Sequence, residues 1–204
     1  MPLVIGLTGN IACGKSTVGE IFKKLGIKVS DSDDLVAQIY ADDKEVQEAL
    51  LKEFGSLDKS VIAKQVFGSE NTNKRNILES IIHPKVDSRF RDWVKENQQE
   101  VFLVSLVPLL FEANLEHRYD RIVTVKTTSE KQIERLKIRN PEWSEDEILK
   151  RIESQMDLDE KLRKSDFIID NSSNLDDLDI QVEEILEQII SKENLDFELK
   201  IAKS

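Results

Sequence analysis

Cysteine is almost missing from this sequence of 204 residues, which contains Cys13 and no other. One thiol cannot form a disulfide within the chain, so the sequence excludes a disulfide-held scaffold and favours a reducing, cytoplasmic compartment. The first residues also lack the charged segment and the long apolar run of a secretory signal peptide, and we expect none.

Long apolar runs are missing as well. The longest apolar-rich segment, residues 101–111, is interrupted by Ser105 and Pro108. It is far shorter than the roughly 20 apolar residues that a helix needs to cross a bilayer. We therefore expect no membrane partner.

Positive charge is scarce: 29 Lys and Arg residues stand against 40 Asp and Glu residues, a net charge of −11. A nucleic-acid binder usually needs a basic face, so we expect no nucleic-acid partner. A small anion remains possible, because backbone N–H groups and a few cations bind phosphates even in an acidic protein. With 39% hydrophobic residues and no repeat or low-complexity linker, the chain fits one globular domain.

The first 30 residues have the pattern of a βαβ unit. Residues 3–7 form a short apolar run, which predicts a buried strand. Val18, Ile21, Phe22 and Leu25 then recur at helical spacing, Gly26 follows as a helix-ending glycine, and residues 27–29 predict a second strand. Such a unit builds a parallel sheet.

Between this first strand and its helix lies a glycine-rich loop that matches G-x-x-x-x-G-K-[ST] at every fixed position. Loop N–H groups and the helix dipole converge there, Lys15 would reach the β- and γ-phosphates, and Ser16 would ligate Mg²⁺. The alternative is a turn with glycines for geometry alone, which would not require Lys before Ser. The predicted ATP-binding residues are Gly9, Asn10, Ile11, Ala12, Cys13, Gly14, Lys15, Ser16 and Thr17.

Cys13 has two interpretations. It fills a small-residue position, or its place near a helix N-terminus lowers the thiol pKa and makes it sensitive to oxidation. The sequence favours the first.

The remaining periodicity predicts an α/β fold. We expect residues 34–97 to be mainly helical, with apolar stripes before Gly55 and after a turn at His83-Pro84. Strands are expected at residues 101–107, 121–125 and 167–169. Capping boxes are expected at Ser129 with Gln132 and at Ser144 with Glu147. The second box opens a helix whose apolar face runs to Met156, and residues 175–189 form the last helix.

Other residues narrow the class of phosphate-loop protein. The fourth strand is not followed by an N-K-x-D motif, which argues against a GTPase. Asp31 and Asp33 follow the second strand, at the sheet edge where ligands gather, and one of them could accept a proton from an acceptor hydroxyl. Equally, both could cap the next helix. Spacing alone leaves the two interpretations open.

Basic residues gather later in the chain, at 135–139 and at Arg151 and Lys161. They could form a flap that closes over ATP and excludes water. For any single arginine, a solvated surface position is the commoner case.

Several segments in this order carry a family resemblance. They are residues 5–9 leading into the phosphate loop, residues 29–33, residues 81–84, residues 107–112, residues 132–139, Arg151-Ile152 with Gln155, and residues 166–171. From about residue 3 to about residue 190 the chain resembles the dephospho-coenzyme A kinase family.

The resemblance implies a reaction and a fold. ATP would phosphorylate the ribose 3′-hydroxyl of dephospho-coenzyme A, giving coenzyme A and ADP. The implied fold is a three-layer P-loop kinase with a five-stranded parallel sheet, a helical substrate lobe and a helical lid. The implied segments are a core at 1–40, 98–128 and 165–190, a lobe at about 41–97 and a lid at about 129–164, in a monomer or small homo-oligomer.

Roles follow from the resemblance position by position. Asp33 matches the proposed general base, Lys15 and Arg139 offset phosphate charge, and Arg139 also contacts ATP. Gln155 and Lys161 match a lid-side helix. The implied substrate-binding residues are Asp31, Asp33, His83, Pro108, Leu109 and Glu112. For His83, simple packing at a helix end is the alternative.

Some positions depart from the family pattern. Asn10 and Ala12 stand where the family usually has glycine, and Gln38 stands where it commonly has Arg, which puts one cationic substrate contact in doubt. Two rival functions also remain: a kinase for another small acceptor, such as a nucleotide or a shikimate-like compound, and a regulatory protein that binds ATP without transferring phosphate.

Overall fold

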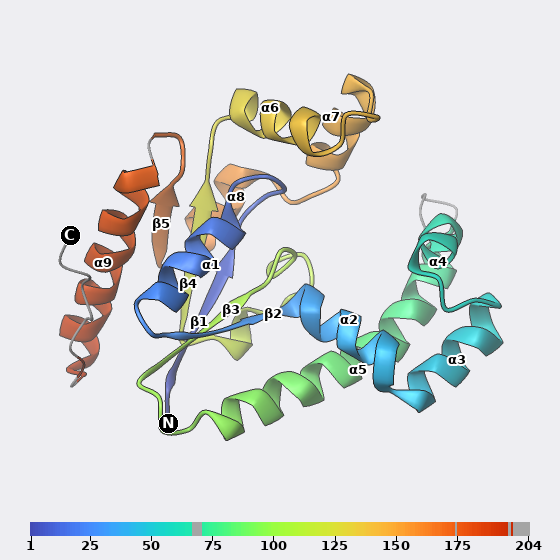
Figure 1. Cartoon of the computed structure of the whole chain (residues 1–204), viewed down its shortest axis with the longest axis horizontal. Coiled ribbons are helices and arrows are strands. Elements are labelled where there is room, and N and C mark those ends of the chain that lie inside the picture. The colour runs from blue at the N-terminus through green and yellow to red at the C-terminus, as the bar shows by residue number, and fades with distance from the viewer. Residues whose placement is uncertain (67–70, 174, 196, 198–204) are drawn as a thin grey trace. The chain divides into compact units, whose positions relative to one another are not determined.

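The computed structural model describes residues 1–66, 71–173, 175–195 and 197. The chain forms two compact units (Figure 1): residues 1–30 with 97–204, and residues 31–96. We call them the core unit and the helical unit and describe each by itself. No helix among the described residues is long and apolar enough to span a membrane.

The core unit is built on a five-stranded sheet in the order β2-β3-β1-β4-β5. Its strands are β1 (Leu3–Thr8), β2 (Lys28–Asp31), β3 (Phe102–Leu106), β4 (Arg121–Lys126) and β5 (Phe167–Asp170). Pairs β1–β3, β1–β4 and β4–β5 are parallel. The predicted sheet is confirmed, and β1 lies at its centre because its apolar run is buried on both faces.

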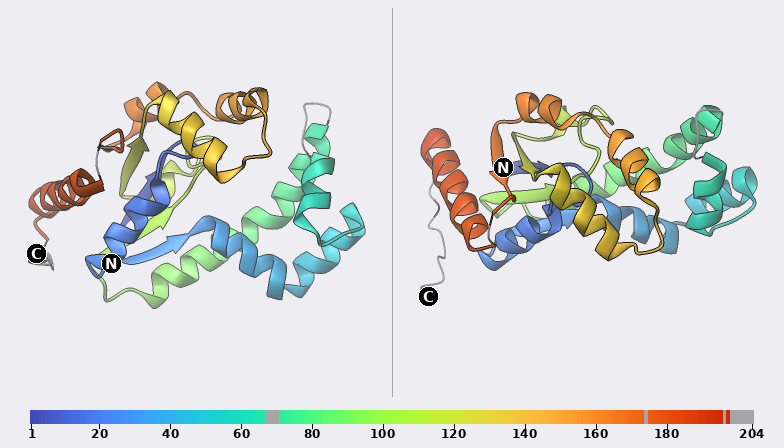
Figure 2. Two further views of the ribbon diagram at one scale, coloured as in Figure 1. Left: turned by 45° about the horizontal axis from the view of Figure 1, so that its top comes forward. Right: turned by 90° about the horizontal axis from the view of Figure 1, so that it is seen from above.

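Helices cover this sheet. Helix α1 (Lys15–Lys24) contacts β3, and α9 (Leu175–Glu193) contacts both β5 and α1. Their apolar faces join the strands in one buried cluster that includes Phe22, Val104 and Leu186. Helices α6 (Ser129–Arg139) and α7 (Glu145–Glu153) lie past the carboxyl end of β4 (Figures 1 and 2), and α8 (Leu158–Lys164) contacts β4.

The helical unit contains α2 (Ser32–Asp42), α3 (Lys44–Phe54), α4 (Lys59–Val66) and α5 (Thr72–Glu96). Helices α2, α3 and α4 all contact α5 and share an apolar cluster around Ile39, Leu50 and Ile62. Gly55 ends α3 with φ 70°, which confirms it as a helix-ending glycine.

The predicted turn at His83-Pro84 is wrong, because both residues lie inside α5. Proline there removes one N–H donor, but its φ is compatible with a helix. Ile82 is buried and Val86 packs on the same cluster, so tertiary packing on both sides of the proline keeps the helix continuous.

Two predicted helix starts have different outcomes. The capping box of Ser144 and Glu147 is confirmed, whereas α6 is capped one residue before Ser129, by the Thr128 side chain. The helix expected to reach Met156 ends at Glu153, and α8 begins separately with Asp157 as its cap. Residues 154–157 therefore belong to neither helix.

Candidate active site

The loop between β1 and α1 has a backbone that only certain residues permit. Gly9 and Gly14 have φ of 147° and 94°. A Cβ at Gly14 would lie 1.9 Å from Asn171 Nδ2, and one at Gly9 would lie 2.3 Å from the Val125 carbonyl oxygen. Ala12, at φ 59°, occupies the left-handed region at a cost of about 1–2 kcal/mol. A glycine at this position would avoid that strain.

The start of α1 is suited to an anion. Its N-cap, Gly14, offers no side-chain oxygen to the first N–H groups, and its first turn holds no acidic residue. Lys15 is half-buried, while Ser16 and Thr17 are exposed. Within the described residues none of these three side chains makes a hydrogen bond or an ion pair. An N-terminus without a side-chain cap, an ammonium and two hydroxyls without partners in the described structure are together suited to a phosphate group.

Side chains from α6 and from the end of β5 hold the carbonyl groups of this loop. Gln132 Nε2 donates to Ile11 O at 2.8 Å, Arg135 Nη1 donates to Ala12 O at 3.1 Å, and Asn171 Nδ2 donates to Cys13 O at 2.8 Å. Arg135 also donates to the Asn171 carbonyl at 3.2 Å. The loop is therefore held in one conformation by contacts within the core unit.

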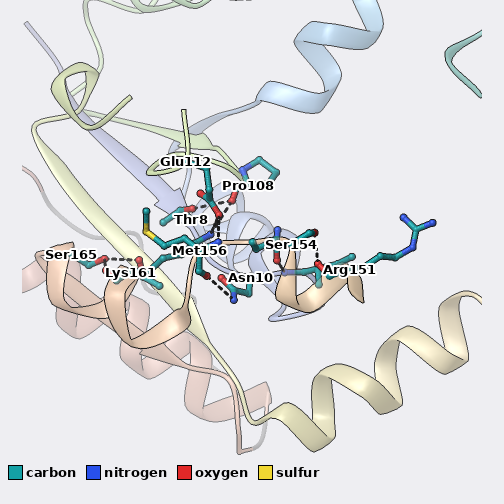
Figure 3. Close-up of polar contacts among 12 residues, drawn as sticks. Thr8, Asn10, Pro108, Glu112, Arg151, Ser154, Met156, Lys161 and Ser165 are labelled. Carbon is teal, nitrogen blue, oxygen red and sulfur yellow. Dashed lines mark hydrogen bonds and ion pairs between the residues drawn. The ribbon is translucent and has the colours of Figure 1, made fainter. Parts of the chain in front are cut away.

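The break between α7 and α8 meets the other side of the loop (Figure 3). Gln155 Oε1 accepts from the Ile11 amide at 2.7 Å, and Asn10 Nδ2 donates to the Met156 carbonyl at 3.4 Å. Gln155, expected on a lid-side helix, instead lies between two helices and contacts the loop directly.

Glu112 and Lys161 form an ion pair next to this break (Figure 3). Lys161 Nζ lies 2.8 Å from Glu112 Oε1, and the Lys161 side chain is fully buried. Glu112 Oε1 also accepts from the Met156 amide at 3.0 Å. Burial raises the pKa of Glu112, but the hydrogen bonds from Lys161 and the Met156 amide outweigh it, so the pKa lies below its ordinary value. Lys161 is thus an internal partner of Glu112 and not an exposed lid cation.

Cys13 is 1% exposed, and burial raises the pKa of its thiol despite the nearby Lys15. A buried neutral thiol is a poor nucleophile, so the structure supports the interpretation that Cys13 fills space. It contributes its backbone to the loop.

The predicted residues after β3 have different surroundings. The Pro108 carbonyl accepts from Thr8 Oγ1 and from Lys161 Nζ, both at 3.4 Å, while Leu109 is 48% exposed. Glu112 Oε2 is buried and has no hydrogen-bond partner among the described residues.

The two arginines of α6 differ. Arg139 lies exposed at the end of the helix and makes no hydrogen bond or ion pair within the described part of the chain. Arg135 is the one bound to the phosphate loop. The sequence pointed to a basic segment, but spacing could not tell which arginine faces the loop; Gln132, Arg135 and Asn171 were missed as loop contacts.

Asp31 and Asp33, both at the start of the helical unit, have different surroundings. Asp31 caps α2, because its Oδ1 accepts from the Asp33 amide at 2.9 Å. Asp33 is exposed in the first turn of α2, and its carboxylate has no partner within the described residues. The capping interpretation therefore holds for Asp31, and the Asp33 carboxylate stays available for chemistry. His83 is exposed on α5.

The phosphate loop, its lysine and the flanking helices are those of a phosphotransferase, and comparison with known proteins identifies the kind. A family model described as dephospho-CoA kinase matches residues 3–177. The chain belongs to the dephospho-CoA kinase family. This confirms the predicted family and, with it, an ATP-dependent kinase that acts on dephospho-CoA.

Relatives agree with the family model. A dephospho-CoA kinase of Bacillus licheniformis is 37% identical over 200 residues, covering 92% of this chain and 96% of the relative. The solved dephospho-CoA kinase of Campylobacter jejuni superposes with a TM-score of 0.68 at 27% identity, covering 96% of this chain and all of that one. A crystal structure from Thermus thermophilus superposes with a TM-score of 0.79 at 29% identity. The match covers 94% of this chain and 97% of that one. The predicted P-loop kinase fold is confirmed.

Proposed function

We propose that the chain transfers the γ-phosphoryl group of ATP to the ribose 3′-hydroxyl of dephospho-CoA, giving CoA and ADP, the last step of coenzyme A synthesis. The observation that carries the proposal is the preformed phosphate loop with an unpartnered Lys15, in a chain that matches the dephospho-CoA kinase family over residues 3–177.

ATP is bound through residues 9–17 in this proposal. The N–H groups at the start of α1 and the Lys15 ammonium face the β- and γ-phosphates and offset the charge on the transferred group. Arg139, free at the end of α6, adds a second cation when residues 129–164 close as a lid. Closure excludes water, which limits transfer to water in place of the acceptor.

The residues present fit Mg²⁺ that arrives with the nucleotide. Across the described residues, no cluster of three or more His, Cys, Asp or Glu side chains is placed to hold a metal ion by itself. The exposed Ser16 hydroxyl at the start of α1 would supply one oxygen ligand, and phosphate oxygens and water would supply the others that Mg²⁺ prefers. When bound, the ion neutralises charge on the phosphates.

Asp33 is the general base in this proposal. It would accept the proton of the acceptor hydroxyl as that oxygen attacks the γ-phosphorus and the bond to ADP breaks. The Asp31 cap supports this role by fixing the first turn of α2, which carries Asp33. His83 and the exposed Leu109 are proposed substrate contacts. The acceptor lobe is proposed at about residues 41–97, nearly all of which lie in the helical unit.

Glu112 is also a proposed substrate contact. Its Oε1 is taken by Lys161 and the Met156 amide, but Oε2 is buried without a donor in the described structure. A buried carboxylate oxygen without a donor is costly, so a hydroxyl or amide of the acceptor is a suitable partner.

ADP release by the purified protein with ATP and Mg²⁺, with and without dephospho-CoA, tests the function. We expect acceptor-dependent ADP and a product heavier by one phosphoryl group, with Lys15→Ala as the inactive control. Shikimate and nucleoside monophosphates serve as alternative acceptors. ADP release that depends on one of those, and not on dephospho-CoA, would refute the proposal.

A further inference from the structure

Lys161 is the most deeply buried charged side chain of the site, and the burial of its ammonium needs an explanation. The residue lies in α8 with 0% of its side chain exposed. Its ammonium contacts the Glu112 carboxylate at 2.8 Å and the Pro108 carbonyl at 3.4 Å. Removing an ammonium from water costs several kcal/mol, and a buried ion pair is weak evidence for stability. The pair therefore invites a role other than holding the fold together.

The contacts of Glu112 lead from Lys161 to the phosphate loop. The oxygen that meets Lys161, Oε1, also accepts from the Met156 amide at 3.0 Å. The carbonyl of Met156 in turn accepts from Asn10 in the loop. The neighbouring Gln155 accepts from the Ile11 amide at 2.7 Å. One short segment, residues 155–156, is thus bound by Glu112 on one side and binds the first half of the phosphate loop on the other.

At this end of the loop, Gln132 from α6 supports the Ile11 carbonyl, whereas the Ile11 amide and the Asn10 side chain are bound by residues 155–156. Asn10 is 5% exposed, and its Oδ1 has no partner among the described residues, so its side chain is held through Nδ2 and Met156. Ala12 holds a left-handed backbone without the freedom of glycine. A displacement of residues 155–156 would therefore reach Asn10 and Ile11 directly.

We propose that Lys161 and Glu112 are positioning residues that hold residues 155–156 against Asn10 and Ile11 and so keep the phosphate loop in its ATP-binding conformation. Neither side chain needs to touch ATP for this role. The inference rests on ATP binding at residues 9–17, as set out above, and does not depend on the identity of the acceptor.

The test compares variants by their dissociation constants for ATP and ADP, each with Mg²⁺ and without any acceptor, by calorimetric titration. Lys161→Met keeps the length and apolar stem but removes the charge. We expect its dissociation constants to rise on the order of tenfold. Arg163→Met, which removes an exposed cation from the same helix, is the matched control and should bind both nucleotides as the wild type does.

A second variant guards against a folding defect. Lys161→Met leaves the half-buried Glu112 carboxylate without its cation, which could unfold the protein. The double variant Glu112→Gln/Lys161→Met removes both charges. The Gln oxygen can still accept from the Met156 amide but is no longer fixed by a cation. We expect the folded double variant to bind ATP more weakly than the wild type, with a smaller change than the single variant.

Wild-type nucleotide affinity in a folded Lys161→Met or double variant, even with a lowered melting temperature, would show that the pair is merely structural and would overturn the inference. The wild type separates this outcome from failure of the proposed function. If the wild type itself bound no ATP, the assignment of residues 9–17 would be wrong; if it bound ATP but used another acceptor, the inference would stand.

Discussion

The two units present their site residues in different ways. In the core unit, Gln132, Arg135 and Asn171 hold three consecutive loop carbonyls, and Gln155 holds a loop amide. In the helical unit, Asp33 and His83 are exposed on helices whose stability comes from an apolar cluster elsewhere in the unit. The proposed nucleotide site is therefore preorganised by a dense local network, whereas the proposed base is fixed by little besides the Asp31 cap.

The largest effect should come from the cation of the preorganised site. Lys15→Ala removes the ammonium that we propose faces the transferred group, and we expect kcat to fall about a thousandfold. Steady-state rates with saturating ATP and dephospho-CoA measure kcat. Lys24→Ala, on an exposed position of the same helix, should keep wild-type turnover. A Lys15→Ala enzyme with near-normal kcat would show that the loop lacks the role given to it.

The next effect should come from the helical unit. Asp33→Asn keeps the size of the side chain but cannot accept the proton, so kcat should fall about a hundredfold. Asp34→Asn changes an exposed neighbour in the same first turn and should have little effect. Steady-state rates with saturating ATP and dephospho-CoA measure kcat for both variants. An equal loss of kcat in the two variants would exclude Asp33 as the base.

Alanine substitutions of Gly14 and Gly55 compare the effect of backbone strain in the two units. Gly14→Ala adds a Cβ 1.9 Å from Asn171 Nδ2 at φ 94°, so it should displace the Asn171 contact to Cys13. We expect a loss of about 2–3 kcal/mol in the free energy of unfolding and weaker ATP binding.

Gly55→Ala is the counterpart in the helical unit. It has φ 70° but no atom within 4 Å of an added Cβ, so strain alone should cost about 1–2 kcal/mol and leave ATP affinity unchanged. Urea unfolding and ATP titration of both variants test the pair. Equal effects of the two variants on ATP affinity would contradict the role of the hydrogen bonds around the loop in ATP binding.

The smallest effect concerns pH. Because the folded-state pKa of Glu112 is lowered from its ordinary value of 4.5, its contribution to stability is present above that value and is lost as pH falls through the folded pKa. The difference in unfolding free energy between wild type and Glu112→Gln should therefore shrink from about pH 6 to about pH 3. Glu134→Gln, on an exposed position of α6, should run parallel to the wild type. A constant difference for Glu112→Gln would contradict the ionised pair.

Local patterns were enough to predict much of the fold. The apolar run before Gly9, the helical spacing from Val18 to Leu25, and the box of Ser144 and Glu147 each depend on nearby residues, and all are confirmed. Pro84 was misread because a proline inside a helix can be offset by packing that the sequence does not display. The separate start of α8 was missed because the apolar spacing continues to Met156 beyond the end of α7.

The site was predictable where one motif carries it and not where distant segments meet. The phosphate loop could be read from eight consecutive residues, 9–16. The contacts of Arg135 with Ala12 and of Lys161 with Glu112 join residues 123 and 49 positions apart. Residue type and spacing do not distinguish a buried lysine from an exposed one, so the burial of Lys161 could not be inferred from the sequence.

Calorimetric titration of ATP with Mg²⁺ into Lys15→Ala and Asp33→Asn, side by side, tests the division between the two units most directly. The account predicts that Lys15→Ala weakens binding at least about tenfold, because the ammonium pairs with phosphate. It predicts that Asp33→Asn binds ATP within about twofold of the wild type, because the base acts on the acceptor. An Asp33→Asn protein that loses ATP as Lys15→Ala does would contradict the account.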